Sequence, residues 1–176
     1  MPIPYSLLLI PMSLSPKIPP YAQDLMNFYS PPNQDGWGVV VFYEQTPPDG
    51  DLEALALAQY QYFVGGSHLE FMRWKPQWKL IYERTPDCEP NIRQELNAAT
   101  WVAGLDYEDR IANQLNYDYD SEENVYAPKV LAVGFNSPQA QDFRVYTLGD
   151  GEVMEGLLAI SRRRNGETLT LAFLKD

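Results

Sequence analysis

Two tight-turn signals near the end of the chain constrain its fold more than any other feature. Gly149-Asp150-Gly151 and Asn165-Gly166 each separate runs of strand-forming residues, and turns of this composition are typical of β-hairpins. After the second turn, Leu169, Leu171 and Phe173 alternate with threonines. Such alternation is typical of a strand with one face against a core. The chain is therefore predicted to end in consecutive antiparallel strands.

Strands are also predicted further upstream. Residues 37–44 form a run of aromatic and β-branched residues, which predicts a strand buried on both faces in the centre of a sheet. Prolines at six of the first twenty positions exclude a long helix there and leave room for one short strand at 5–10. The remaining strands are predicted at 68–74, 78–84, 129–135, 142–148, 152–163 and 167–174.

Helices are predicted where apolar residues recur three or four positions apart. The clearest one begins after Asp51, a residue type that commonly caps helices, and ends at Gly65-Gly66. Its expected inner side is formed by Leu52, Leu55, Ala58 and Tyr62. Further helices are predicted at 21–29, 91–105 and 106–115.

Together these elements predict a single α+β domain over residues 1–176. Its sheet is expected to be mixed or antiparallel, with the helices packed on one side. Residues 1–20 form a proline-rich N-terminal segment, and residues 128–176 form a four-stranded antiparallel meander at the C-terminus.

The scarcity of histidine and cysteine limits the chemistry of the chain. His68 and Cys88 are the only residues of their types, so a multi-histidine zinc site, a cysteine cluster and an intrachain disulfide are excluded. We expect no cofactor and no tightly bound transition metal. A single cysteine without a recognisable targeting signal favours the cytoplasm, and no apolar stretch reaches the ~18 residues of a membrane span.

The charge is strongly negative and unevenly distributed. The formal net charge is −11, which disfavours binding to nucleic acid or to anionic membranes. Residues 85–127 hold ten acidic residues against two arginines. This concentration predicts a protein partner, with a basic protein as one candidate, that binds at the carboxylates Asp106, Glu108, Asp109, Asp118, Asp120, Glu122 and Glu123.

Two smaller features are further candidates for binding. Asp118, Asp120 and Glu122 alternate in a loop predicted at 116–124, a spacing that allows weak calcium binding. The EF-hand pattern fails there, and a solvated loop is the simpler interpretation. A second candidate partner surface is formed by the aromatic residues Trp74, Trp78 and Tyr82, because such side chains dominate interface hot spots. Strand alternation places Trp78 and Tyr82 on one face, which is either packed or exposed.

Three classes of function are compatible with these observations. The first, which we prefer, is a non-catalytic binding or regulatory module for another protein, because it needs no coincidence of residue placement. The second is a carboxylate-dependent hydrolase whose acids are brought together by the fold. The third is an acidic nucleic-acid mimic that inhibits a nuclease or a DNA-binding protein. No set of catalytic residues is identified by the sequence.

Overall fold

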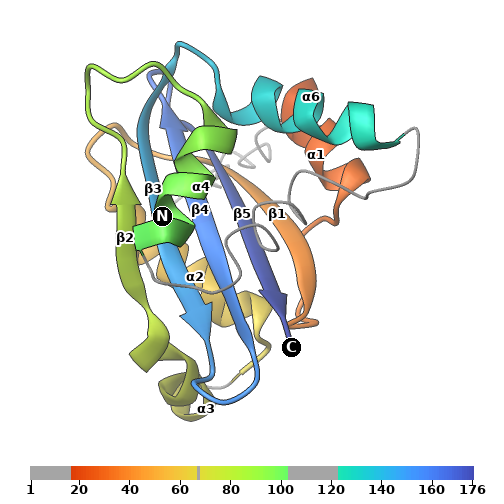
Figure 1. Cartoon of the computed structure of the whole chain (residues 1–176), viewed down its shortest axis with the longest axis vertical. Helices are drawn as coiled ribbons and strands as arrows, with labels where there is room; N and C mark the ends of the chain where they lie inside the picture. The colour runs from red at the N-terminus through yellow and green to blue at the C-terminus, as the bar shows by residue number, and fades with distance from the viewer. Residues whose placement is uncertain (1–16, 67, 103–122) are drawn as a thin grey trace, which may run out of the picture.

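A five-stranded antiparallel sheet with helices on both faces organises the protein (Figure 1). A computed structural model describes residues 17–66, 68–102 and 123–176. The helices are α1 (Pro20–Phe28), α2 (Leu52–Phe63), α3 (His68–Trp74), α4 (Ile92–Val102) and α6 (Glu123–Phe135), with a 3-10 turn η1 (Lys75–Gln77). The strands are β1 (Gly38–Gln45), β2 (Lys79–Glu83), β3 (Ala140–Gly149), β4 (Glu155–Arg163) and β5 (Glu167–Lys175). Their order is β1-β5-β4-β3-β2.

The predicted α+β class and the antiparallel meander are confirmed. Strands β2, β3, β4 and β5 lie side by side, each antiparallel to its neighbour. The first strand of this meander is β2, however, and the predicted strand at 129–135 is part of α6. A short apolar run does not by itself distinguish a strand from a buried helical segment. Here Leu131 and Phe135, four residues apart, are buried, while Val133 is 59% exposed, which is a helical pattern.

Close approach of α6 to α1 depends on Gly134. A Cβ atom at this position would lie 2.7 Å from Leu25 Cδ1 and 3.0 Å from Leu169 Cδ2. Only glycine therefore lets the two helices and β5 meet at this distance.

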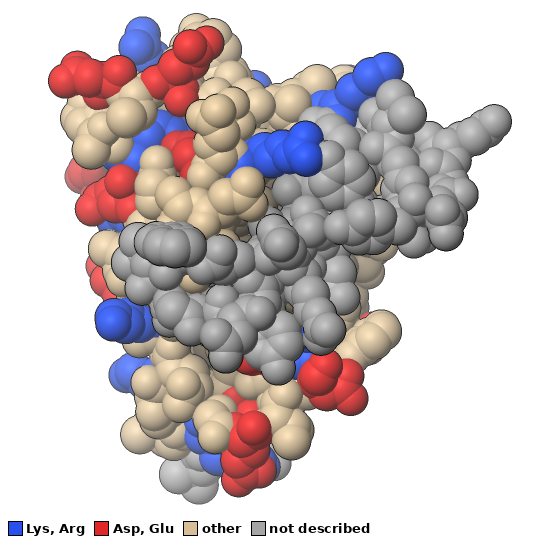
Figure 2. Space-filling model, in the orientation of Figure 1, with Lys and Arg blue, Asp and Glu red and all other residues tan. Residues whose placement is uncertain are grey.

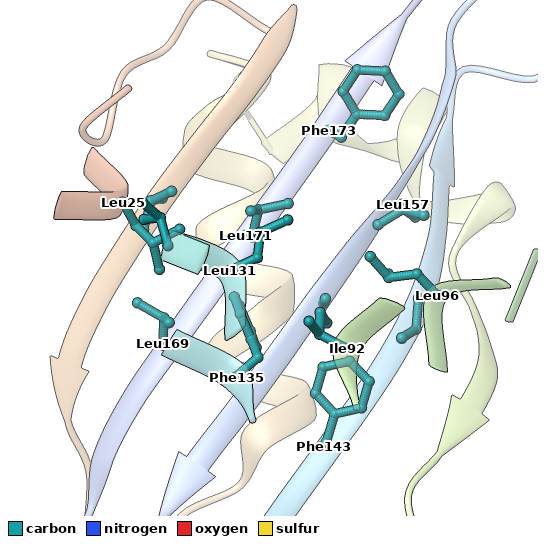
Figure 3. Close-up of a cluster of buried hydrophobic side chains, with 14 of the residues drawn as sticks. Leu25, Ile92, Leu96, Leu131, Phe135, Phe143, Leu157, Leu169, Leu171 and Phe173 are labelled. Carbon is teal, nitrogen blue, oxygen red and sulfur yellow. The ribbon is translucent and has the colours of Figure 1, made fainter. Parts of the chain in front are cut away.

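Helices cover both faces of the sheet, and the expectation that they pack on one side is wrong. On one face, Leu25, Ile92, Leu131 and Phe135 from the helices meet strand residues such as Phe143 (Figure 3). On the opposite face, α2 and α3 cover a second core. The threonines that alternate along β5 suggested a solvent-facing side, but they are buried beneath this second layer.

Strand β1 is confirmed as a strand, but it lies at the edge of the sheet and not at its centre. Val40, Val41 and Phe42 are consecutive and all buried. Their burial comes from helices above and below the sheet, since Val41 belongs to one core and Val40 and Phe42 to the other. A continuous apolar run therefore indicates that both faces of the strand are covered by other elements. It does not require a neighbouring strand on each side.

Two local predictions also need correction. Residues 68–74, predicted as a strand, form the helix α3. In α2 the buried residues are Leu52, Ala56, Gln59, Tyr60 and Phe63, whereas Ala58 and Tyr62 are exposed. Because α2 carries apolar residues around most of its circumference, periodicity alone did not fix its inner face.

Asp51 does cap α2 as predicted, accepting hydrogen bonds from the backbone N–H groups of Glu53 and Ala54.

Parts of the predicted architecture lie outside the described residues. They are the strand at 5–10, the helix at 106–115 and the loop at 116–124 up to residue 122. Among the helices that are described, none is long and apolar enough to cross a membrane.

Buried tyrosine hydroxyls make the stability of the fold sensitive to high pH. Tyr60 is buried and its Oη donates to the backbone O of Gly149 and accepts from the Gly149 N–H. Burial raises the pKa of Tyr60, and it also raises the pKa of Tyr21 and of Tyr29. These phenols therefore stay protonated in the folded chain at pH values where the unfolded chain ionises, above about 10.

We expect the free energy of unfolding to be unaffected by these groups below pH about 9 and to fall as the pH rises above about 10. A folded-state pKa above the unfolded value gives this sign, because deprotonation then favours the unfolded chain. Urea unfolding between pH 8 and 11 measures the slope, and Tyr60→Phe should reduce it. A slope of the same size in Tyr60→Phe would contradict the role given to this hydroxyl.

Candidate functional site

A groove of about 550 Å³ follows the edge of the sheet at β1, where no further strand pairs within residues 17–66, 68–102 and 123–176. It wraps around this edge between α1 and α2, which lie on opposite faces. Met26 of α1 and Tyr43 of β1 belong to one side of the sheet, and Phe42 of β1 with Leu55 and Tyr62 of α2 belong to the other. The two prolines at 31–32, which lead from α1 to β1, also line the groove.

The backbone of β1 directs hydrogen-bonding groups into this edge. The Val41 N–H donates to Ser30 O at 2.9 Å, so it faces away from β5. In an antiparallel pair, alternate residues direct their backbone groups to the same side. The N–H and C=O of Tyr43 therefore also face outward, while those of Phe42 and Glu44 face β5. An edge of this kind is a template for an additional strand.

Aromatic side chains give the groove an apolar lining. Tyr62 is 46% exposed and lies edge-on to Phe42, with ring centroids 6.2 Å apart. Tyr43 is half-buried, and its pKa is raised by burial and, to a lesser degree, by the nearby Glu167 carboxylate. Exposed aromatic residues beside a free sheet edge are the composition that protein interfaces favour.

Gln59 is the buried polar residue of the groove. It is 4% exposed, and its Nε2 donates to Glu44 Oε1 at 3.4 Å. Its Oε1 is buried and has no hydrogen-bond partner among the described residues. Rotating the amide by half a turn would place Oε1 against the Glu44 carboxylate, so the observed orientation is the favourable one. Gln59, which lines the groove, therefore carries one buried acceptor that lacks a donor among the described residues, a costly arrangement in a folded protein.

Most of the predicted acidic site lies outside the described residues. This applies to Asp106, Glu108, Asp109, Asp118, Asp120 and Glu122, and hence to the calcium loop as well. Glu123 is the first residue of α6. On the face shown in Figure 2, acidic and basic side chains of the described residues lie interspersed. The partner-binding role of the acidic segment stays a prediction.

The aromatic residues predicted as a second surface do not share one face. Trp78 stacks on Tyr146 and Tyr60, with ring centroids 4.2 Å and 5.8 Å away, and Trp74 lies edge-on to the same Tyr60. Tyr82 packs against the other core, edge-on to Phe143.

Trp74 belongs to the helix α3, whereas Trp78 directly precedes β2. Trp78 and Tyr82 lie on opposite faces because the ladder is irregular between Leu80 and Tyr82. A bulge of this kind inserts one residue and breaks the alternation of faces. Trp74, Trp78 and Tyr82 are all half-buried, and their part in partner binding stays a prediction.

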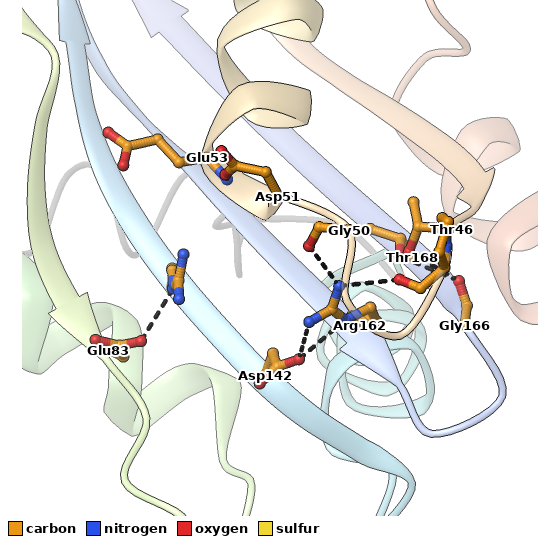
Figure 4. A network of polar contacts seen from close by, with 11 residues as sticks. Thr46, Gly50, Asp51, Glu53, Glu83, Asp142, Arg162, Gly166 and Thr168 are labelled. Atoms are coloured by element: carbon orange, nitrogen blue, oxygen red, sulfur yellow. Dashed lines mark hydrogen bonds and ion pairs between the residues drawn. The ribbon is translucent and has the colours of Figure 1, made fainter.

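Carboxylates near a second pocket are held in ion pairs. This pocket, of about 690 Å³, is lined by Glu83 and Asp142 among others. Glu83 Oε1 accepts from Arg144 at 3.0 Å. Asp142 Oδ2 accepts from Arg162, whose guanidinium also donates to the backbone O of Gly50 (Figure 4). Both acids thus fasten neighbouring segments together.

In residues 17–66, 68–102 and 123–176, no three histidine, cysteine or acidic side chains gather to hold a metal ion.

Comparison with known proteins gives no relative: no family model matches the chain, and neither does a curated protein or a solved structure. Inference about function therefore depends on the geometry of the chain itself.

The sequence did not point to the groove. The sequence pattern predicts Tyr43 in a central strand and Tyr62 on the inner side of a helix. Gln59 carried the best available signal, because it lies between the apolar residues Ala56 and Phe63 on one side of a helix. A glutamine at such a position is expected to be buried and to need partners.

Proposed function

We propose that this protein is a non-catalytic binding module that takes up an extended segment of a partner protein along the edge of the sheet at β1, which no other described strand covers. The observation that carries the proposal is the outward-facing backbone of Tyr43 within an apolar, aromatic groove. Main-chain hydrogen bonds of an added strand would supply affinity, and alternate side chains of the segment would contact the walls formed by α1 and α2.

The charge of the chain supports a basic partner. With a net charge of −11, the protein attracts basic partners over a distance and accelerates their association more than it tightens the final complex. The segment 85–127, with ten acidic residues against two arginines, carries most of this formal charge. The hydrolase and nucleic-acid-mimic alternatives have no specific observation in their favour among the described residues.

The proposal is tested by two variants of the same residue, Tyr43→Pro and Tyr43→Ala. Both remove the ring, but only proline removes the N–H that an added strand would use. Because this N–H faces away from β5, proline leaves the existing ladder intact, as is usual on an edge strand. Octapeptides selected from a random display library on the full-length protein serve as probes. Fluorescence anisotropy should show binding about tenfold weaker for Tyr43→Pro than for Tyr43→Ala.

Circular dichroism establishes that both variants are folded. As a second measurement on the unaltered protein, each selected peptide is N-methylated at one position at a time. Strand addition predicts that binding is lost at every second position, because alternate N–H groups face β1. Equal affinities of the two variants together with no two-residue periodicity would refute strand addition.

A further inference from the structure

We propose that the β1 groove selects an arginine side chain of the bound segment and holds it between Gln59 and Glu44. This inference deepens the proposed function by naming the chemistry of the ligand. Its starting point is Gln59 Oε1, a buried acceptor without a donor among the described residues. Since the Nε2 end of the amide is directed to Glu44, the ligand has to bring an N–H or O–H group to the oxygen end.

The charge of the groove favours a cation as that donor. Glu44 is the only charged residue among the described residues that line the groove, and no lysine or arginine lies in the lining. Its contact with Gln59 Nε2 is long, at 3.4 Å, and Glu44 is exposed. A carboxylate has about four lone-pair sites, so most of its hydrogen-bonding capacity remains for a ligand.

The shape and the aromatic lining favour guanidinium over ammonium. A guanidinium has five N–H donors in a planar fork, so one group can donate to Gln59 Oε1 and to the Glu44 carboxylate at the same time. It is also more weakly hydrated than an ammonium and stacks on aromatic rings. Tyr62, which is 46% exposed, offers such a ring in the same groove.

Thr170 provides the competing explanation of the unpartnered oxygen. Its Oγ1 is likewise buried without a partner among the described residues, and it lies on β5 opposite Phe42. Because a buried water molecule would satisfy an oxygen of this kind without a ligand, a test has to detect the cation itself.

The experiment uses small probes, so that its result does not depend on strand addition. N-acetyl-arginine N-methylamide is titrated into the full-length ¹⁵N-labelled protein, alongside the citrulline and lysine analogues. Citrulline has the shape of arginine without its charge. We expect saturable shifts of the Gln59 side-chain amide and the Tyr43 backbone amide with arginine. Binding should be at least tenfold weaker for citrulline and several-fold weaker for lysine.

Variants identify the groups that bind the cation. Glu44→Gln should weaken arginine binding at least fivefold, whereas Glu152→Gln, which removes the same charge at the exposed β3–β4 connection, should not change it. Gln59→Met removes the acceptor at similar volume. It should weaken arginine binding without loss of thermal stability, because no buried acceptor is then left unsatisfied.

Equal shifts with arginine and citrulline, or shifts that are insensitive to Glu44→Gln, would overturn the arginine site. The proposed function has a separate readout. If selected octapeptides bind without arginine while the Tyr43 variants differ as expected, strand addition stands and the arginine site does not. If arginine binds at Gln59 but the Tyr43 variants are equal and the N-methylated peptides show no two-residue periodicity, the arginine site stands and strand addition does not.

Discussion

Replacement of Glu95 by leucine is expected to lower the free energy of unfolding by about 3–5 kcal/mol, because it leaves the charge of Arg84 buried without a counter-ion. The two side chains are 2% and 6% exposed and form a two-pronged ion pair, with both N···O distances at 2.6 Å. The Arg84 guanidinium also lies 4.7 Å from the centre of the Phe143 ring and donates to the backbone O of Ala140.

This pair connects several elements. Arg84 follows β2, Glu95 lies in α4, and a further donor of Arg84 reaches Phe135 O at the end of α6 at 3.4 Å. Glu95 also accepts from the Tyr82 hydroxyl. Removal of either charged partner therefore loosens α4 and α6 from the sheet.

Urea unfolding followed by circular dichroism measures the effect in Glu95→Leu, Arg84→Met and the double variant. The double variant should be more stable than either single variant, because it leaves no unpaired buried charge. A loss below about 1 kcal/mol in Glu95→Leu, the size of an exposed pair, would show that the pair is screened by water.

No sequence pattern pointed to this pair. Glu95 was counted with the acidic residues of 85–127 as part of a charged surface, yet it lies inside the protein. Eleven positions separate it from Arg84, and their meeting depends on how α4 packs on β2. Charge counting along a sequence carries no information on such long-range packing.

The C-terminal hairpins were predictable because their signals are local. The Asn165-Gly166 turn has Gly166 at a positive φ of 85°, a conformation that glycine adopts without strain. The helices at 68–74 and 129–135 were mistaken for strands because short apolar or aromatic runs fit both structures. Their helical state is decided by packing against the two faces of the sheet.

The candidate site was not predictable for a related reason. A groove at a sheet edge exists only once the strand order is known, and β1 was expected at the centre. The order β1-β5-β4-β3-β2 places the first and the last of the described strands together. This pairing spans more than 120 residues, between Gln45 and Glu167 at its nearest point, and no local signal encodes it.

Replacement of Leu171 by aspartate is expected to unfold the protein. Leu171 is 1% exposed and lies on β5 between Val41 of β1 and Ala159 of β4, under the helices of the first core (Figure 3). The described members of that core are hydrophobic, and the buried arginine that borders it, Arg84, is already paired with Glu95. Burial of an unpaired carboxylate costs several kcal/mol. This is comparable to the total stability of a typical domain, about 5–15 kcal/mol.

Val133→Asp provides the matched control, since Val133 is on α6 and exposed. Thermal unfolding should show a cooperative transition for Val133→Asp close to that of the unaltered protein, and none for Leu171→Asp. A soluble Leu171→Asp protein with an unchanged melting temperature would mean that this face of β5 is open to water.

The cores on the two faces also share β5, because Ala172 and Leu174 belong to the second core. Loss of the first core should therefore remove the second, and with it the α2 wall of the β1 groove.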